Sequence, residues 1–248
     1  MTASTGYCTV PDVRRALQRA EFTGPLEMDN KQTVVHAITS QGQWLRSQTS
    51  RHWYEPTGLD EDEFDIIPTE PKTHNGEEQD IPSTPHAGPS QMQVAAAKQA
   101  RYPLRNNDPF TRIRLDKHYV GEVTGLEVKE PTGAYTDWVA DDSYTEDRDW
   151  SLYVEPGTTS SPSFIDLRAG KIPSLSNYDN AVRVSYSYGS EGIPMGVRRA
   201  TAMKAAAQLL APDDEASLGI PENANLQAVE TKVGALERQA EELLEVYL

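Results

Sequence analysis

The chain has 248 residues, of which 38 are Asp or Glu and 23 are Lys or Arg, so its net charge is −15. This length allows one large domain or two modest ones, and 37% of the residues are hydrophobic and can form the core. The charge excludes the usual nucleic-acid-binding surface, because phosphate neutralisation needs clusters of Lys and Arg. No apolar run approaches the roughly 20 residues of a membrane span, no secretory signal is expected, and the single cysteine, Cys8, cannot form an internal disulfide.

Two helices are predicted before residue 55. The first begins near Thr9, which can cap it, with Pro11 in the first turn and Asp12 in the position of a capping-box acid. The second is predicted from about residue 30 to residue 54, where one stripe is apolar: Val34, Ile38, Leu45 and Trp53. We therefore assign residues 1–54 to the N-terminal helices of a helical core.

Residues 55–109 have a different composition. They are dense in Pro, Asp and Glu, and such a segment cannot bury enough apolar surface to fold by itself. We expect an extended arm or loop, with a short Ala-rich helix over 91–101. The acidic run at 60–63 lacks the spaced oxygen ligands of a calcium loop.

Residues 110–189 are predicted to form an antiparallel β insert. Turn signals separate short apolar segments, which indicate strands near 113–115, 120–128 (bulged, or a strand pair), 138–139, 150–154 and 164–167. The clearest strand is at the end of the insert, where apolar and polar residues alternate strictly through Val182, Val184, Tyr186 and Tyr188.

A short turn then joins this strand to a helix. Gly189 breaks the alternation, Pro194 stands where a helix would begin, and an Ala-rich helix follows from Met195 until Pro212 stops it. Residues 190–221 are therefore assigned to a core helix and a linker.

The last segment, 222–248, is predicted to be a heptad helix. Its apolar residues alternate steps of three and four, at Leu226, Val229, Val233, Leu236, Ala240, Leu243 and Tyr247. Two interpretations stay open: a terminal helix folded onto its own domain, or a helix that packs on another protein or on neighbouring copies.

Three stretches together resemble the head–tail connectors, or adaptors, of tailed phages. The matching residues are Tyr7, Thr9, Asp12 and Val13 near the start, Thr49, Arg51 and Trp53 at the end of the second helix, and Tyr186, Tyr188, Gly189, Pro194 and Val197 to Thr201 at the strand-to-helix turn. The β insert is longer than in compact connectors, so the resemblance does not assign its role.

The resemblance implies an α+β fold, with a helical bundle from both chain ends, an inserted antiparallel β domain and a long C-terminal helix. It also implies a virion structural protein in the neck between capsid and tail, assembled in the host cytoplasm. Copies of the chain, expected to number twelve, would form a ring-shaped adaptor beneath the portal. The expected partners are therefore other copies, the portal, the next neck or tail protein, and duplex DNA that passes without specific binding, with no membrane.

Contact residues follow from the resemblance as hypotheses. Contact with the portal or with neighbouring subunits is expected at Leu226, Val229, Val233, Leu236, Leu243 and Tyr247. Subunit or channel contacts are expected at Arg51, Arg198 and Arg199. The acid excess, with 8 Lys against 15 Arg, resembles proteins that work in molar salt and indicates a haloarchaeal tailed virus; an ordinary acidic protein is the alternative.

Other functions are weighed against the adaptor. A stopper or similar neck component would have a related architecture, and a halophilic β-sandwich ligand-binding module belongs to a different class. We predict no enzymatic activity, cofactor or metal, because no histidine has a metal-ligand spacing and no phosphate loop or Gly-x-Ser-x-Gly motif occurs.

Overall fold

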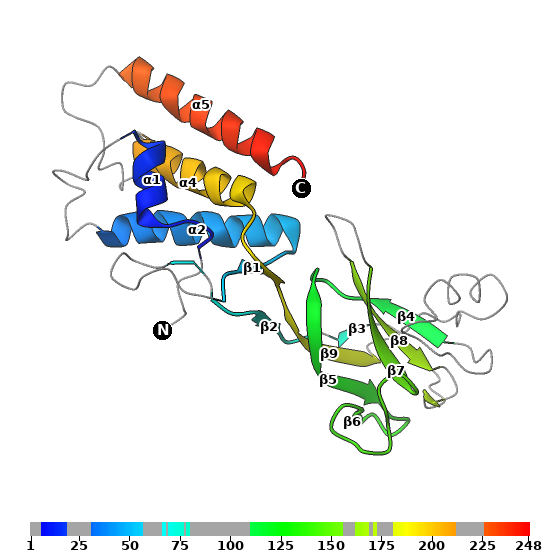
Figure 1. Ribbon diagram of the computed structural model, residues 1–248. Coiled ribbons are helices and arrows are strands. Elements are labelled where there is room, and N and C mark those ends of the chain that lie inside the picture. The colour runs from blue at the N-terminus through cyan, green and yellow to red at the C-terminus, as the bar shows by residue number, and fades with distance from the viewer. Residues whose placement is uncertain are drawn as a thin grey trace. The chain divides into compact units, whose positions relative to one another are not determined.

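The computed structural model of the chain describes residues 6–18, 31–56, 66–67, 69–76, 78–79, 110–155, 162–168, 171–172, 181–211 and 226–248. The chain divides into two compact units, Met1–Pro71 with Ser190–Leu248, called the helical unit here, and Lys72–Gly189, called the β unit. Figure 1 shows helices from both chain ends in the first and strands in the second. The predicted α+β class is therefore confirmed.

The helical unit is built around α4 (Met195–Leu210), which packs against three other helices: α1 (Val10–Ala16), α2 (Lys31–Thr49) and α5 (Leu226–Leu244). Small side chains on α4 let these helices approach closely, and the buried ones include Ala200, Ala205, Ala206 and Ala207. The unit also contains a two-stranded parallel pair, β1 (Trp53–Tyr54) with β10 (Ser190–Glu191). None of the described helices combines the length and apolarity that a membrane span needs.

The β unit contains two antiparallel sheets with a shared apolar core. The first has the order β2 (Lys72–His74), β9 (Val182–Tyr188), β5 (Val120–Lys129) and β6 (Tyr135–Asp137), and β3 (Glu78–Gln79) also pairs with β9. The second has the order β4 (Phe110–Arg114), β8 (Ser163–Arg168) and β7 (Trp150–Val154). The predicted alternation of β9 is confirmed, because its apolar residues are buried and the residues between them are half-buried.

Two further strand predictions are confirmed in detail. The register between β5 and β9 shifts between Val120 and Glu122 and again between Val123 and Gly125, so β5 is one irregular strand rather than a strand pair. The predicted strands at 150–154 and 164–167 correspond to β7 and β8.

The predicted end of the second helix was wrong. The helix stops at Thr49, whose hydroxyl donates to the Leu45 carbonyl at 2.8 Å, and Ser50 takes a left-handed φ of +52°. A left-handed residue interrupts the helical hydrogen bonds, so the chain turns away. Trp53 and Tyr54 therefore form β1 instead of a last helical turn.

One strand prediction within the insert also needs correction. The strand expected at 138–139 lies at Tyr135–Asp137 instead, because the Asp137 carboxylate accepts the backbone N–H of Leu126 and of Val139, each at 3.0 Å, and ends the ladder there.

The extended arm expected over 55–109 is partly a strand region, since β2 and β3 pair with β9. Gly76 makes this pairing possible, because a Cβ at that position would lie 2.0 Å from the Val184 carbonyl oxygen. The short helix predicted over 91–101 lies outside the described residues.

Candidate functional site

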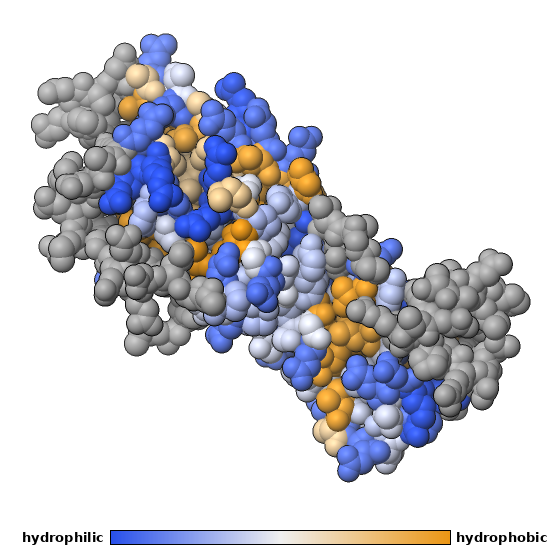
Figure 2. Space-filling model, viewed as in Figure 1, coloured by the Kyte–Doolittle hydropathy of each residue, from blue (hydrophilic) through white to orange (hydrophobic). Residues whose placement is uncertain are grey.

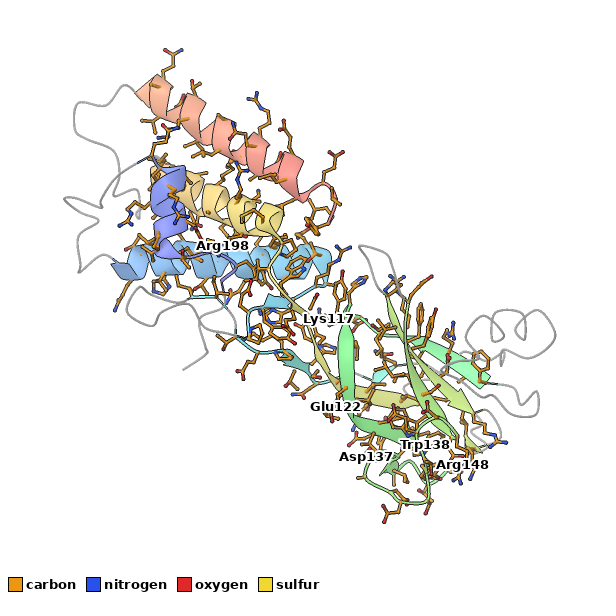
Figure 3. The ribbon with its side chains drawn as sticks, viewed as in Figure 1. Lys117, Glu122, Asp137, Trp138, Arg148 and Arg198 are labelled. Carbon is orange, nitrogen blue, oxygen red and sulfur yellow. The ribbon has the colours of Figure 1, made fainter. Side chains whose placement is uncertain are left out.

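A buried carboxylate connects the start of the helical unit to its central helix. Asp12 on α1 is only 9% exposed and accepts four hydrogen bonds: from the Thr9 N–H at 3.0 Å, the Thr9 hydroxyl at 2.9 Å, Arg15 Nη1 at 2.7 Å and Arg198 Nε at 2.7 Å. The predicted capping acid is confirmed. Figure 3 labels Arg198, which reaches from α4 to α1.

These hydrogen-bond donors stabilise the negative charge of Asp12. Burial raises the pKa of the Asp12 carboxyl, but hydrogen bonds from Arg198 and Thr9 lower it by more, so the pKa lies below its ordinary value. Asp12 is therefore a stable anion at neutral pH, and it fixes Arg198 in place as one side of a surface groove.

We call this surface the α1–α4 groove. It has a volume of about 460 Å³, and the residues that line it include Asp12, Arg15, Arg198, Arg199, Met195 and Met203. Met195 is 68% exposed and Arg199 is exposed. The lining therefore combines three cationic residues and one anionic residue with apolar side chains, on a chain whose net charge is −15.

The heptad helix packs on its own unit. Along α5, Leu236, Ala240 and Leu244 are buried against the rest of the helical unit, and Val229 and Val233 are half-buried. The last turn of α5 lies beside the start of α4, since a Cβ added at Gly196 would be in ordinary van der Waals contact, 3.6 Å, with the Leu243 carbonyl oxygen. The first of the two interpretations of this helix therefore describes the isolated chain, and the side chain of Leu226 lies outside the described part.

The expected contact residues fall into two groups. Arg198 and Arg199 share the α1–α4 groove, whereas Arg51 is 6% exposed and its guanidinium carbon lies 6.0 Å from the ring centre of Tyr247. Tyr247 also meets the Trp53 ring edge-on at 5.7 Å. Arg51 and Tyr247, predicted separately, thus lie together beneath the last turn of the chain. The groove residues that sequence reasoning missed are Arg15, Met195 and Met203.

The β unit has its own buried carboxylate, Asp149. It accepts the Thr145 N–H at 3.0 Å and two hydrogen bonds from Arg148. Burial raises the pKa of Asp149, but the hydrogen bonds from Arg148 and Thr145 outweigh it and the pKa is lowered. Figure 3 labels Arg148 and also Trp138, whose ring stacks on Tyr144 with the ring centres 4.4 Å apart. These contacts order a loop between strands.

The remaining reactive groups have structural positions. Burial, and then the charge of Asp12, raise the pKa of the Cys8 thiol well above its ordinary value, so Cys8 stays protonated. His52 is fully buried and shares a hydrogen bond of 3.1 Å with the Tyr7 hydroxyl. Among the described residues, no three His, Cys, Asp or Glu side chains form a cluster that could hold a metal ion.

These features define a two-unit α+β protein with a charged surface groove on a helical core that both chain ends build. No protein-family model matches the chain, and none of the curated proteins is similar to it.

The chain is similar in structure to a chain from the neck of an empty gene transfer agent (GTA) particle, computed with C6 symmetry, with a TM-score of 0.42. It is also similar to a chain from the virion of a native GTA particle, with a TM-score of 0.40. Each is 12% identical to this chain, and each alignment covers 92% of this chain and 87% of the other.

Proposed function

We propose that this chain is a structural protein of the neck of a tailed virus, where its copies form a ring-shaped adaptor beneath the portal. The ring extends the DNA channel and offers a docking surface to the next neck or tail protein. The observation that carries the proposal is the contact between two stretches that resemble a head–tail connector. Asp12 and Arg198 are 186 residues apart in the chain, and they form an ion pair of 2.7 Å.

The stretch that contains Arg198 also lies at a position that matters to the fold. Tyr186 and Tyr188 are buried in the core of the β unit, Gly189 takes a φ of +147°, and Pro194 is the N-cap residue of α4. The strand-to-helix segment of the connectors thus corresponds here to the passage from β9 into the central helix. This correspondence supports the adaptor over an unrelated α+β domain.

The charge of the chain fits a conduit for DNA. Attraction between a protein wall and duplex DNA grows with the number of Lys and Arg side chains that contact phosphates. A subunit of net charge −15 gives a ring that repels the polyanion on average. DNA can therefore pass through such a ring without being held.

Purification of the full chain, alone and co-expressed with the portal protein of the same virus, tests the proposal. We expect closed rings by negative-stain microscopy and native mass measurement in high salt, and a complex in which the ring and the portal co-purify. A chain that remains monomeric from low to molar salt, or that forms only two-fold dimers, would contradict the adaptor. Rings that bind another neck ring but not the portal would reassign the chain to a stopper.

A further inference from the structure

We infer that copies of this chain bind head to tail, with the α1–α4 groove of one copy receiving the acidic end of α5 of the next copy. The α5 acidic end is defined by exposed residues of the last turn of α5 and of the turn that follows it: Glu241, Glu242, Glu245 and Val246. Glu241 lies 4.0 Å from Lys204 of its own chain, so Glu242 and Glu245 are the carboxylates offered to another copy. The choice of a second copy as the occupant rests on the proposed ring. The contact itself is argued from charge and exposure.

The groove is a positive site on a negative protein. The Arg15 side chain is 75% exposed, and Arg199 is exposed with no ion-pair partner among the described residues. Arg198 is held against Asp12, so the three guanidinium groups leave an excess of two positive charges around the groove. Within a chain of net charge −15, this excess selects an acidic occupant.

The groove also has an apolar part. Met195 is 68% exposed and lies in the groove lining together with Met203. Figure 2 shows hydrophobic and hydrophilic surface mixed over the helices of this unit. Unbranched Met side chains adapt to an irregular partner surface. The occupant should therefore carry an apolar side chain beside its carboxylates.

The α5 acidic end has both features. Glu242 and Glu245 are exposed, and Val246 beside them is 64% exposed. The helix that carries them is fixed, because Leu244 is buried against the helical unit. A rigid helical end of this composition complements the groove in charge and in polarity, and little conformational entropy is lost when it docks.

The two surfaces are different, so the contact between copies is heterologous. Among the described residues the groove is lined by α1 and α4, whereas the acidic end belongs to α5. Each copy therefore carries one donor surface and one acceptor surface. Contacts of this kind generate a ring when the rotation between neighbours closes.

Charge reversal on each surface tests the contact. We expect Arg199→Glu, and separately Glu242→Lys, to weaken self-association of the full chain about tenfold or more, because each places like charges together. The controls are Arg114→Glu on β4 and Glu230→Lys at the start of α5, which are also exposed and change the net charge equally. Sedimentation velocity measures the association, and Arg199→Glu combined with Glu242→Lys in one chain should restore it.

A mixing experiment separates the contact from the ring. A groove variant, Arg15→Glu with Arg199→Glu, keeps its α5 end, and an α5 variant, Glu242→Lys with Glu245→Lys, keeps its groove. Each should be monomeric alone, and the 1:1 mixture should give a heterodimer that cannot extend.

Three results would overturn the contact: wild-type association by the Arg199→Glu variant, equal weakening by the controls, or a mixture that stays monomeric. If the wild-type chain forms rings while any of these results is obtained, the ring proposal stands and only this interface is rejected. If the mixture gives heterodimers but the wild-type chain never forms closed rings, the ring proposal is rejected and the contact is retained.

Discussion

The Asp12 carboxylate allows a quantitative prediction about the helical unit. Asp12→Asn keeps the size of the side chain and its ability to accept from Thr9, but it removes the negative charge that faces Arg198. Asp12 is 9% exposed and the Arg198 side chain 26% exposed, so the pair is shielded from water. The Arg15 side chain is 75% exposed, so its bond to Asp12 contributes little.

The expected cost follows from these contacts. A hydrogen bond to a charged group contributes about 1.5–3 kcal/mol, and removing one partner of a buried ion pair costs about 3–5 kcal/mol. Because Arg198 retains some contact with water, we expect Asp12→Asn to lower the free energy of unfolding by about 2–4 kcal/mol. Urea unfolding followed by circular dichroism at 222 nm measures this loss, since the described helices all belong to the helical unit.

The pH dependence has a defined sign. The pKa of Asp12 is lowered in the folded protein, so its contribution to stability is complete above the unfolded pKa of about 3.9 and is lost as the pH falls through the lower folded pKa. The difference between wild type and Asp12→Asn should therefore be constant near neutrality and shrink below about pH 4.

A matched control is Asp141→Asn in the β unit. Asp141 accepts the Ser143 N–H at 2.9 Å, and this hydrogen bond lowers the pKa of Asp141 as well. This control should leave the helical transition unchanged. The reasoning would be refuted if the free energy of unfolding of Asp12→Asn lay within about 0.5 kcal/mol of the wild-type value, or if the difference between them did not shrink in acid.

Three further outcomes are expected. Leu244→Ala should cost about 3 kcal/mol in the same urea experiment, because Leu244 is 1% exposed, whereas Val246→Ala at a 64% exposed position should cost almost nothing; equal effects would show that α5 is not part of the core. Ring formation should strengthen as salt rises from about 0.01 M to about 1 M. The Debye length then falls from roughly 30 Å to roughly 3 Å, so subunits of charge −15 repel each other less. Light scattering measures the assembly, and scattering that is independent of salt would contradict this prediction. The isolated ring should show no duplex-DNA binding by fluorescence anisotropy at moderate salt, and sub-micromolar binding that weakens steeply with salt would make the protein a nucleic-acid partner.

The strand β9 and the helix α4 could be predicted because their signals are local. Strict alternation of apolar residues from Val182 to Tyr188 has one structural solution, and Pro194 marks where the helix begins. The end of the second helix could not be predicted, because no local pattern requires the left-handed φ of Ser50. The pairing of β1 with β10 across the chain accompanies this turn.

The candidate site was predictable only in part, for a related reason. Asp12 has a local signal as a capping acid, but its ion pair with Arg198 joins positions 186 residues apart. The heptad on α5 predicted the packed side of the helix but missed Leu244, which is buried, whereas the predicted Leu243 is half-buried. A helix of 3.6 residues per turn drifts away from a strict 3.5-residue repeat when it packs on a straight neighbour.

The strong negative charge and the positive groove act over different distances. Repulsion between whole subunits extends over about a Debye length, roughly 8 Å at physiological salt, and molar salt removes most of it. Contact between Arg199 and the α5 acidic end would be closer and partly dehydrated beside Met195, and such pairs are screened much less. Salt should therefore control whether copies assemble, while the groove determines which surfaces meet.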